Sequence, residues 1–246
     1  MNTTIIISVK NRHENAKYCL YSIAHCDPKP SEVIVVDFGS RIPVNSIAKR
    51  FKFVRVIRTE NDVKKFHKAR ALNIGIKAAK TKFICVTDVD QIFQKNFFGV
   101  LNHTLEKNNK CFVKCITYFL NTANVLPDRP QDIMMEYFRL LKHAKKFGRK
   151  PFGEGNCNGV SRSWAVRVRG YDERYIGWGY EDSNFYKRAR MDGFGTIWLK
   201  NTTMIHMFHK RNPNYFHMPS IRKSLKMFTD TPQPLIANEE KEWGKV

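Results

Sequence analysis

The chain has 246 residues, of which 42% are hydrophobic and 13% aromatic. That is enough apolar material for a sizeable core, so the composition excludes a globally disordered protein. Lysine and arginine number 43 against 22 aspartates and glutamates, which gives a formal net charge of +21. Such an excess favours an anionic partner: nucleic acid, an anionic membrane surface or a phosphorylated substrate.

We expect neither a membrane-spanning segment nor a secretory signal in this sequence. Its longest apolar runs, such as Ile5–Ile7, are far shorter than the roughly 20 residues that span a bilayer, and Met1–Thr4 lacks the features of a secretory signal. The cysteines are scattered, form no CxxC pair and are expected to be reduced thiols. We therefore predict a cytoplasmic protein (host cytoplasm if viral) without a transmembrane segment. The oligomeric state stays open.

Strands and helices alternate through the first half of the chain. Apolar runs predict strands over 4–9, 32–37, 53–57 and 82–87, and helical periodicity predicts helices over 12–25 and 66–80. This alternation indicates βαβ units, a parallel sheet and right-handed crossovers. Ligands of such sheets bind beyond the carboxyl ends of the strands. Polar residues end three of the predicted strands, at Lys10–Arg12, Asp37 and Asp88–Asp90.

The second half is less regular. We expect a strand over 111–120, helices over 131–147 and 181–191, and a proline-containing tail from about Tyr215 that lies on the body. No repeat or low-complexity linker divides the chain. We therefore predict one domain over 1–246, made of a nucleotide-binding half (1–110), an acceptor-binding and catalytic half (111–212) and a C-terminal tail (213–246).

The first motif with evident chemistry is Asp88-Val89-Asp90, after the fourth predicted strand. Carboxylates at i and i+2 share one side of an extended chain, so both can face one cavity. Such oxygen ligands suit Mg²⁺ or Mn²⁺, which complete their coordination with phosphate oxygens. The alternative is a pair of loop acids or a helix cap, but the position after a parallel strand favours a metal site.

Two further motifs lie in the second half. Glu181 and Asp182 open a predicted helix, whose N-terminus lowers the pKa of a carboxylate and keeps it ionised as a general base. Helix capping is the alternative. His206 and His209 stand at i and i+3, and neutral imidazoles suit a divalent transition metal such as Mn²⁺. For them the alternative is a pair of core histidines.

Over roughly residues 4–212, the order and spacing of these motifs resemble metal-dependent glycosyltransferases of the GT-A type. The sequence is similar to family-two glycosyltransferases, to animal beta-1,4-galactosyltransferases and to enzymes of the chondroitin-polymerase type. The resemblance implies an α/β, GT-A (Rossmann-like) fold with a mainly parallel central sheet flanked by helices, and a UDP-sugar donor used with Mn²⁺ or Mg²⁺. It rests on Lys10–Arg12 with Tyr18–Tyr21, Phe66–Ala69 with Leu72–Gly75, Val86–Asp90, Gly159–Ser161 with Gly170–Glu173, and Gly177–Asp182.

The resemblance also implies roles for individual residues. Asp182 would deprotonate the acceptor hydroxyl, and one such base without a nucleophilic carboxylate implies inversion of configuration. Asp90 would bind the metal together with His206 or His209, and the choice between the two histidines stays open. Tyr180 stands where a glycine is common and narrows the sugar site. The donor would contact Lys10, Arg12, Asp37, Phe66, Lys68, Asp88 and Val89, and the sugar and acceptor would contact Trp178, Gly179, Tyr180 and Glu181.

The distribution of charge bears on the acceptor. Residues 139–150 carry six basic residues and no acid. We favour a polyanionic acceptor, namely a hydroxymethylated base in DNA as in phage-type DNA modification, with the duplex positioned by its phosphates and the base flipped out. One alternative is a polysaccharide, lipopolysaccharide or capsule glycan at an anionic membrane, with 131–147 as an interfacial helix. Others are a non-catalytic nucleic-acid-binding module, or a merely solvated basic surface.

Overall fold

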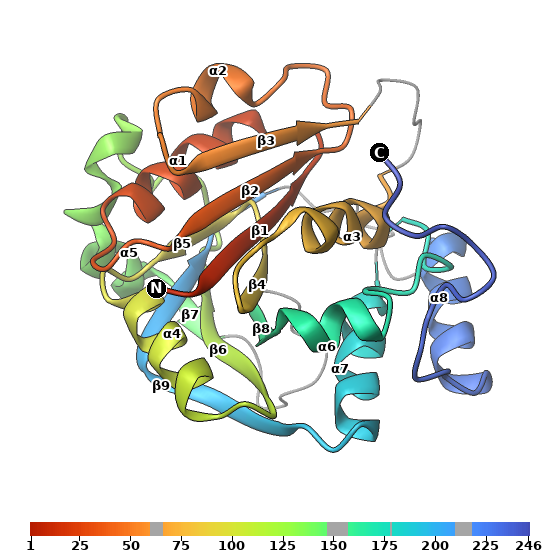
Figure 1. The fold of residues 1–246 in the computed structure, drawn as a ribbon. Coiled ribbons are helices and arrows are strands. Elements are labelled where there is room, and N and C mark those ends of the chain that lie inside the picture. Colours follow the sequence, from red (N-terminus) through yellow and green to blue (C-terminus); the bar gives the residue numbers. More distant parts are fainter. Residues whose placement is uncertain (60–65, 147–156, 178, 210–217) are drawn as a thin grey trace.

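The structure is a computed structural model that describes residues 1–59, 66–146, 157–177, 179–209 and 218–246. Its sheet has the strand order β3-β2-β1-β4-β8-β6-β9-β5, with β7 paired to β6 (Figure 1). The strands are β1 (Thr3–Val9), β2 (Glu32–Asp37), β3 (Val54–Arg58), β4 (Phe83–Asp88), β5 (Gln91–Phe93), β6 (Cys111–Phe119), β7 (Lys145–Lys146), β8 (Cys157–Ser161) and β9 (Gly195–His206). The helices are α1 (His13–Ala24), α2 (Asn45–Ala48), α3 (Lys68–Ala78), α4 (Phe97–Lys107), the 3₁₀ helix η1 (Pro130–Met134), α5 (Tyr137–His143), α6 (Arg162–Arg167), α7 (Glu181–Met191) and α8 (Pro219–Asp230).

The first half of the sheet is parallel. β3, β2, β1 and β4 pair in parallel, as their alternation with helices predicts. Beyond β4 the sheet becomes mixed, because β8 runs antiparallel to β4 and β6, whereas β9 runs parallel to β6. β5 closes this end of the sheet as the antiparallel partner of β9.

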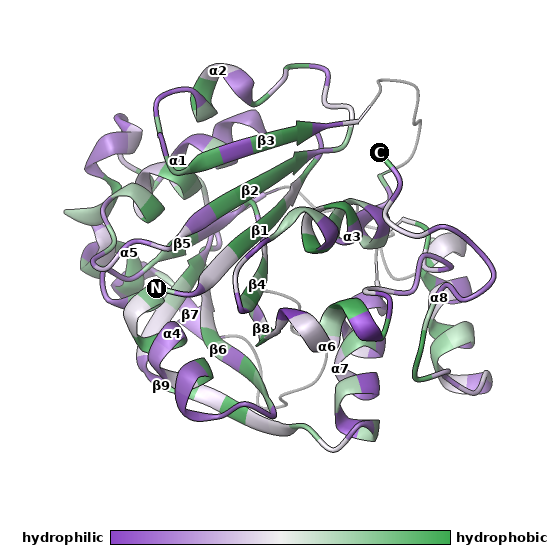
Figure 2. Cartoon of the chain, in the orientation of Figure 1, coloured by the Kyte–Doolittle hydropathy of each residue, from purple (hydrophilic) through white to green (hydrophobic). Residues whose placement is uncertain are grey.

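Side chains that alternate along the strands divide the core into two layers. Ile5 and Ile7 of β1 pack in the layer that contains α1, and Ile6 packs in the layer that contains α3. Figure 2 shows the corresponding apolar strands inside and polar residues on the outer sides of the helices. A Cβ at Gly75 of α3 would lie 2.3 Å from Cγ2 of Ile6, so this close packing requires glycine.

One expectation about the second half is wrong. Residues 131–147 are not one helix, because η1 and α5 are separate and Lys145–Lys146 leave the helix to pair with β6. The C-terminal segment contains a helix, α8, that the sequence did not predict. Pro219 begins this helix, at a position where the missing N–H costs no hydrogen bond. Across the described residues, no helix combines the length and apolar character needed to cross a membrane.

Candidate active site

The carboxyl ends of the parallel strands lie level with one another. Val9 is paired with Asp37, and Ser8 is paired with Asp88, so the loops that follow β1, β2 and β4 share one edge of the sheet. Lys10 joins two of these loops, because its Nζ donates to the carbonyl oxygens of Phe38 (2.9 Å) and Gly39 (3.2 Å). This edge is where a parallel sheet binds ligands.

Asp37 is fully buried and shapes the loop after β2. Its Oδ1 accepts a hydrogen bond from the Ser40 N–H (2.9 Å), and its Oδ2 accepts from the Val44 N–H (3.2 Å) and Arg58 Nη1 (2.6 Å). The carboxylate therefore holds the loop through three donors. Sequence reasoning missed Arg58, which lies at the end of β3. Of the other predicted donor-binding residues, Phe66 packs edge-on against Phe38 at 6.0 Å and Arg12 lies at the start of α1.

Lys68, the first residue of α3, connects the two acidic motifs. Its ammonium lies 2.9 Å from Asp88 Oδ1, 2.9 Å from Asp182 Oδ2 and 3.3 Å from Glu181 Oε1. Burial disfavours its charge, but Asp182, Asp88 and Glu181 together outweigh burial and raise the pKa of Lys68 well above its ordinary value. The side chains of the two motifs therefore converge on one buried cation.

Glu181 and Asp182 begin α7 after a loop with unusual backbone angles. Gly177, Gly179 and Tyr180 have φ values of 95°, 111° and 68°, which turn the chain sharply into the helix. Burial raises the pKa of Glu181 to about 7, and Asp182 adds to this against the opposing effect of Lys68. The expectation of a lowered pKa is therefore wrong for Glu181, because desolvation outweighs the helix dipole. Trp178 lies outside the described residues.

Asp182 has a second partner besides Lys68. Nδ2 of the buried Asn158 donates to Asp182 Oδ1 at 2.8 Å and also lies 3.0 Å from the Tyr171 hydroxyl. Asn158 comes from β8 and Tyr171 follows α6, so two further elements orient this carboxylate. Sequence reasoning missed both residues. Their only signal was a position inside, or next to, the glycine-containing motifs of the second half.

Asp90 belongs to a separate cluster with both histidines. Its Oδ1 lies 3.5 Å from His206 Nε2, and its Oδ2 lies 3.3 Å from His209 Nε2. The three side chains can place one ligand atom each within 4.8 Å of one another. Asp90 Oδ1 is buried and accepts no hydrogen bond from any described residue. A carboxylate with two imidazoles suits Mn²⁺, so these residues fit a divalent metal.

The two aspartates of the Asp88-Val89-Asp90 motif face different clusters. We expected both in one cavity because of extended geometry, but Val89 and Asp90 form a turn, and the Val89 side chain packs in the core. Asp88 meets Lys68, whereas β5 carries the chain from Asp90 back along β9, with Gln91 opposite His206. The clusters remain neighbours: burial raises the pKa of Asp88, Lys68 opposes this, and Asp90 adds to the rise.

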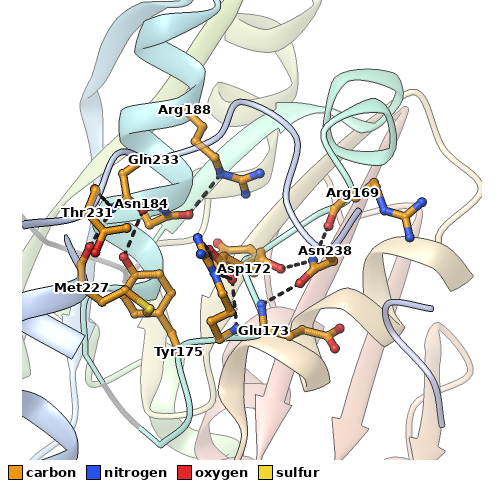
Figure 3. Close-up of polar contacts among 12 residues, drawn as sticks. Arg169, Asp172, Glu173, Tyr175, Asn184, Arg188, Met227, Thr231, Gln233 and Asn238 are labelled. Atoms are coloured by element: carbon orange, nitrogen blue, oxygen red, sulfur yellow. Dashed lines mark hydrogen bonds and ion pairs between the residues drawn. The ribbon is translucent and has the colours of Figure 1, made fainter. Parts of the chain in front are cut away.

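The C-terminal segment supports the helix that carries the acidic pair. Gln233 Oε1 accepts from Asn184 Nδ2 (2.6 Å) of α7, and Gln233 Nε2 donates to the carbonyl oxygens of Met227 and Thr231 (Figure 3). Asn184 Oδ1 in turn accepts from Arg188 Nε at 3.1 Å. Gln233 therefore connects the C-terminal end of α8 to α7 by hydrogen bonds.

An aromatic pair brings α8 next to the loop that precedes the acidic pair. The Tyr180 ring stacks on Phe228 of α8 with centroids 5.6 Å apart. A Cβ on Gly177 would lie 3.8 Å from Ser220 Cβ, so the first turn of α8 is also close to this loop. One side of the site is therefore built by a segment that the sequence did not predict to be helical.

A mixed sheet flanked by helices, with acidic residues beyond its strand ends, is the architecture of glycosyltransferases of the GT-A type. The chain belongs to glycosyl transferase family 2, whose family model matches residues 4–169. A second model, the N-terminal domain of galactosyltransferase, matches residues 139–211. The resemblance noted in the sequence and the predicted fold class are therefore confirmed.

Individual relatives agree with this assignment. An uncharacterized glycosyltransferase of Rickettsia felis is 31% identical over 112 residues, covering 44% of this chain and 18% of the relative. Chondroitin sulfate N-acetylgalactosaminyltransferase 2 of Mus musculus is 28% identical over 153 residues, which cover 60% of this chain and 27% of the relative. The chain thus spans about a fifth to a quarter of the length of these relatives. The structure of GalNAc-T7 with UDP, GalNAc and Mn²⁺ superposes with a TM-score of 0.68 at 14% identity, covering 94% of this chain and 48% of that one.

Proposed function

We propose that the protein is an inverting, metal-dependent glycosyltransferase that moves a sugar from a UDP-sugar to a hydroxyl of a saccharide acceptor. The observation that carries the proposal is the convergence of Asp88, Glu181 and Asp182 on Lys68, next to the cluster of Asp90 with two histidines. A transferase needs a base for the acceptor and a cation for the departing diphosphate, and the two neighbouring clusters offer one each.

The metal would be Mn²⁺ or Mg²⁺ held by Asp90, His206 and His209. Bound there, it would act as a Lewis acid that offsets charge on the departing diphosphate. The chain's own residues arrange the donor side: Lys10 and Asp37 hold the loops after β1 and β2 in place. Arg12 and Phe66 are further proposed donor-binding residues near the same edge. The Val89 side chain packs in the core, so its proposed contact with the donor would be made by its backbone.

Asp182 is the proposed general base. Lys68 and Asn158 each occupy one of its oxygens, at 2.9 and 2.8 Å. A carboxylate oxygen can accept two hydrogen bonds, so both oxygens keep capacity for the acceptor hydroxyl. The two partners fix the orientation of the carboxylate, and the proton of the acceptor would pass to it as the new glycosidic bond forms. With Asp182 as the single base and direct attack of the acceptor hydroxyl on the donor, the anomeric configuration would be inverted.

The acceptor is proposed from the relatives. The name of the Mus musculus relative contains chondroitin sulfate and N-acetylgalactosamine, and the superposed structure of GalNAc-T7 contains UDP and GalNAc. These names favour a saccharide acceptor, and they make UDP-N-acetylgalactosamine the first donor to test. The prediction of a DNA acceptor rests mainly on the amount and distribution of positive charge, and we place the saccharide ahead of it.

The proposal is tested with radiolabelled UDP-sugars, Mn²⁺ and two acceptors: chondroitin-type oligosaccharides and duplex DNA with hydroxymethylated bases. We expect label in the oligosaccharide and a loss of transfer when a chelator is added. Asp182→Asn should lower turnover by about a hundredfold or more, because it removes the base, while UDP affinity changes little. Label only in DNA would refute the saccharide acceptor. Near-normal turnover of Asp182→Asn would place the base elsewhere.

A further inference from the structure

A surface patch on α5 and the segments directly before and after it combines exposed apolar and basic side chains. Met135 and Phe138 are 76% and 65% exposed, and four basic residues accompany them. The inner side of this segment packs in the core, because Ile133 of η1 and Tyr137 and Leu140 of α5 are buried. The Tyr137 hydroxyl also donates a hydrogen bond to the Thr203 carbonyl oxygen at 2.9 Å. We call the outer side the α5 patch; it consists of Met135, Phe138, Arg139, Lys142, Lys145 and Lys146.

The residues of the patch come from three consecutive segments. Phe138 and Lys142 stand at i and i+4 of α5 and therefore share one side of the helix, Met135 lies in the turn before α5, and Lys145 and Lys146 form β7. Arg139 lies beside them and pairs with Glu136, and Asp132 at the border pairs with Arg129 at 2.7 Å. Lys142, Lys145 and Lys146 make no ion pair with any described residue, so their charges are available to a partner.

A groove adjoins the patch. It has a volume of about 380 Å³ and is lined by apolar Met134, Tyr137 and Phe138 on α5 and η1, and by Lys95, Asn96, Gln94 and Asp27 from the segments beside them. Lys95 and Asn96 are exposed and can donate hydrogen bonds to a phosphate, while the apolar side chains suit a short stretch of acyl chain. The groove therefore offers both kinds of contact that a phospholipid needs.

We propose that the α5 patch binds the surface of an anionic lipid bilayer. Exposed Phe and Met side chains next to several lysines are the composition of interfacial segments, which insert apolar groups among the headgroups while their lysines meet lipid phosphates. A nucleic acid would use the lysines but would leave Met135 and Phe138 in water, so the apolar side chains favour the bilayer. The patch lies on the opposite side of the molecule from α8 (Figure 1), so the contacts of α8 with the active-site loop do not cover it.

The inference is independent of the proposed function, and its test does not use enzymatic activity. The full chain is sedimented with phosphatidylglycerol-containing vesicles and with pure phosphatidylcholine vesicles, in the presence and absence of duplex DNA at equal phosphate concentration. We expect binding to the anionic vesicles only, weakened as salt rises from about 0.1 to about 0.5 M. Phe138→Ser should weaken vesicle binding by about tenfold, and Lys145→Ala or Lys146→Ala by about fivefold each.

Matched variants elsewhere control for general effects of charge and hydrophobicity. Ile42→Ser removes a side chain that is 57% exposed on the β2–α2 loop, and Lys49→Ala removes an exposed lysine at the end of α2. Neither should change vesicle binding by more than about twofold if the α5 patch is the contact. The proposal is overturned if vesicles do not bind, or if the controls weaken binding as much as the patch variants. It is also overturned if DNA displaces the vesicles while Phe138→Ser binds like the unmodified chain, which would identify a nucleic-acid surface.

Discussion

Replacing Lys68 by methionine tests the convergence of the two acidic motifs directly. Lys68 is 3% exposed and lies within 2.9 to 3.3 Å of Asp88, Glu181 and Asp182. Methionine keeps the apolar stem but leaves three buried or partly buried carboxylates without their cation. Removing one partner of a buried ion pair costs about 3–5 kcal/mol. For a chain of this size that corresponds to a melting temperature lower by about 6–20 °C.

The loss of stability should depend on pH in a defined direction. Without the ammonium, the pKa values of Asp88 and Glu181 rise further, so the folded variant binds more protons than its unfolded chain. Its free energy of unfolding then falls as pH rises, and the deficit relative to the unmodified protein should be larger at about pH 7 than at about pH 5. The raised pKa of Lys68 itself matters only in alkaline solution, because that contribution is lost as pH rises through the folded value.

Urea unfolding at both pH values measures the effect, and Lys17→Met serves as the control. Lys17 lies 2.8 Å from Glu14 on the surface, where such pairs contribute about 0.5 kcal/mol or less. The reasoning is wrong if Lys68→Met lowers the free energy of unfolding no more than the control does. It is also wrong if the loss of stability becomes larger at acidic pH, because the ammonium then does not hold the carboxylates.

Three further predictions concern single residues of the site. His206→Ala and His209→Ala should each weaken Mn²⁺ binding by about tenfold or more, measured by calorimetry, because each removes one ligand; unchanged affinity would exclude the cluster. Glu181→Gln should flatten the fall in stability between pH 4.5 and about 7, since the raised pKa makes the folded state bind more protons there; an unchanged slope would assign it to other groups. Asn158→Ala should lower kcat by about tenfold with little change in UDP affinity, because Asp182 loses an orienting bond; a matching loss of UDP affinity would indicate a general structural role.

The parallel half of the fold was predictable because its signals are local. β1, β2 and β4 are apolar runs, and α1 and α3 show helical periodicity, so each element can be identified from its own residues. β8 has no such run, since it contains Asn158 and Gly159 and depends on pairing with β4. The sequence did not predict α8, because the prolines in this segment indicate a break in secondary structure, although Pro219 in fact begins the helix.

The same contrast between local and distant signals holds for the site. Aspartate and histidine are restricted to a few chemical roles, so the sequence could predict that Asp90 lies with His206 and His209. The link between Lys68 and Asp182 joins residues 114 positions apart and depends on how α3 packs against β1. The hydrogen bond from Asn158 likewise requires β8 to lie beside β4, which no local pattern indicates. Composition and spacing therefore identify reactive groups more readily than they identify the residues that orient those groups.

Net charge was the least specific guide, and the structure indicates why. Among the described residues at the site, the carboxylates of Asp88, Asp90, Glu181 and Asp182 face one lysine and two histidines. The centre is therefore acidic, and it would meet a diphosphate through a bound metal ion rather than through surface lysines. The positive excess of +21 lies elsewhere, in part on the α5 patch. A charge summed over the whole chain averages these two regions, so it does not by itself indicate the chemistry of the acceptor.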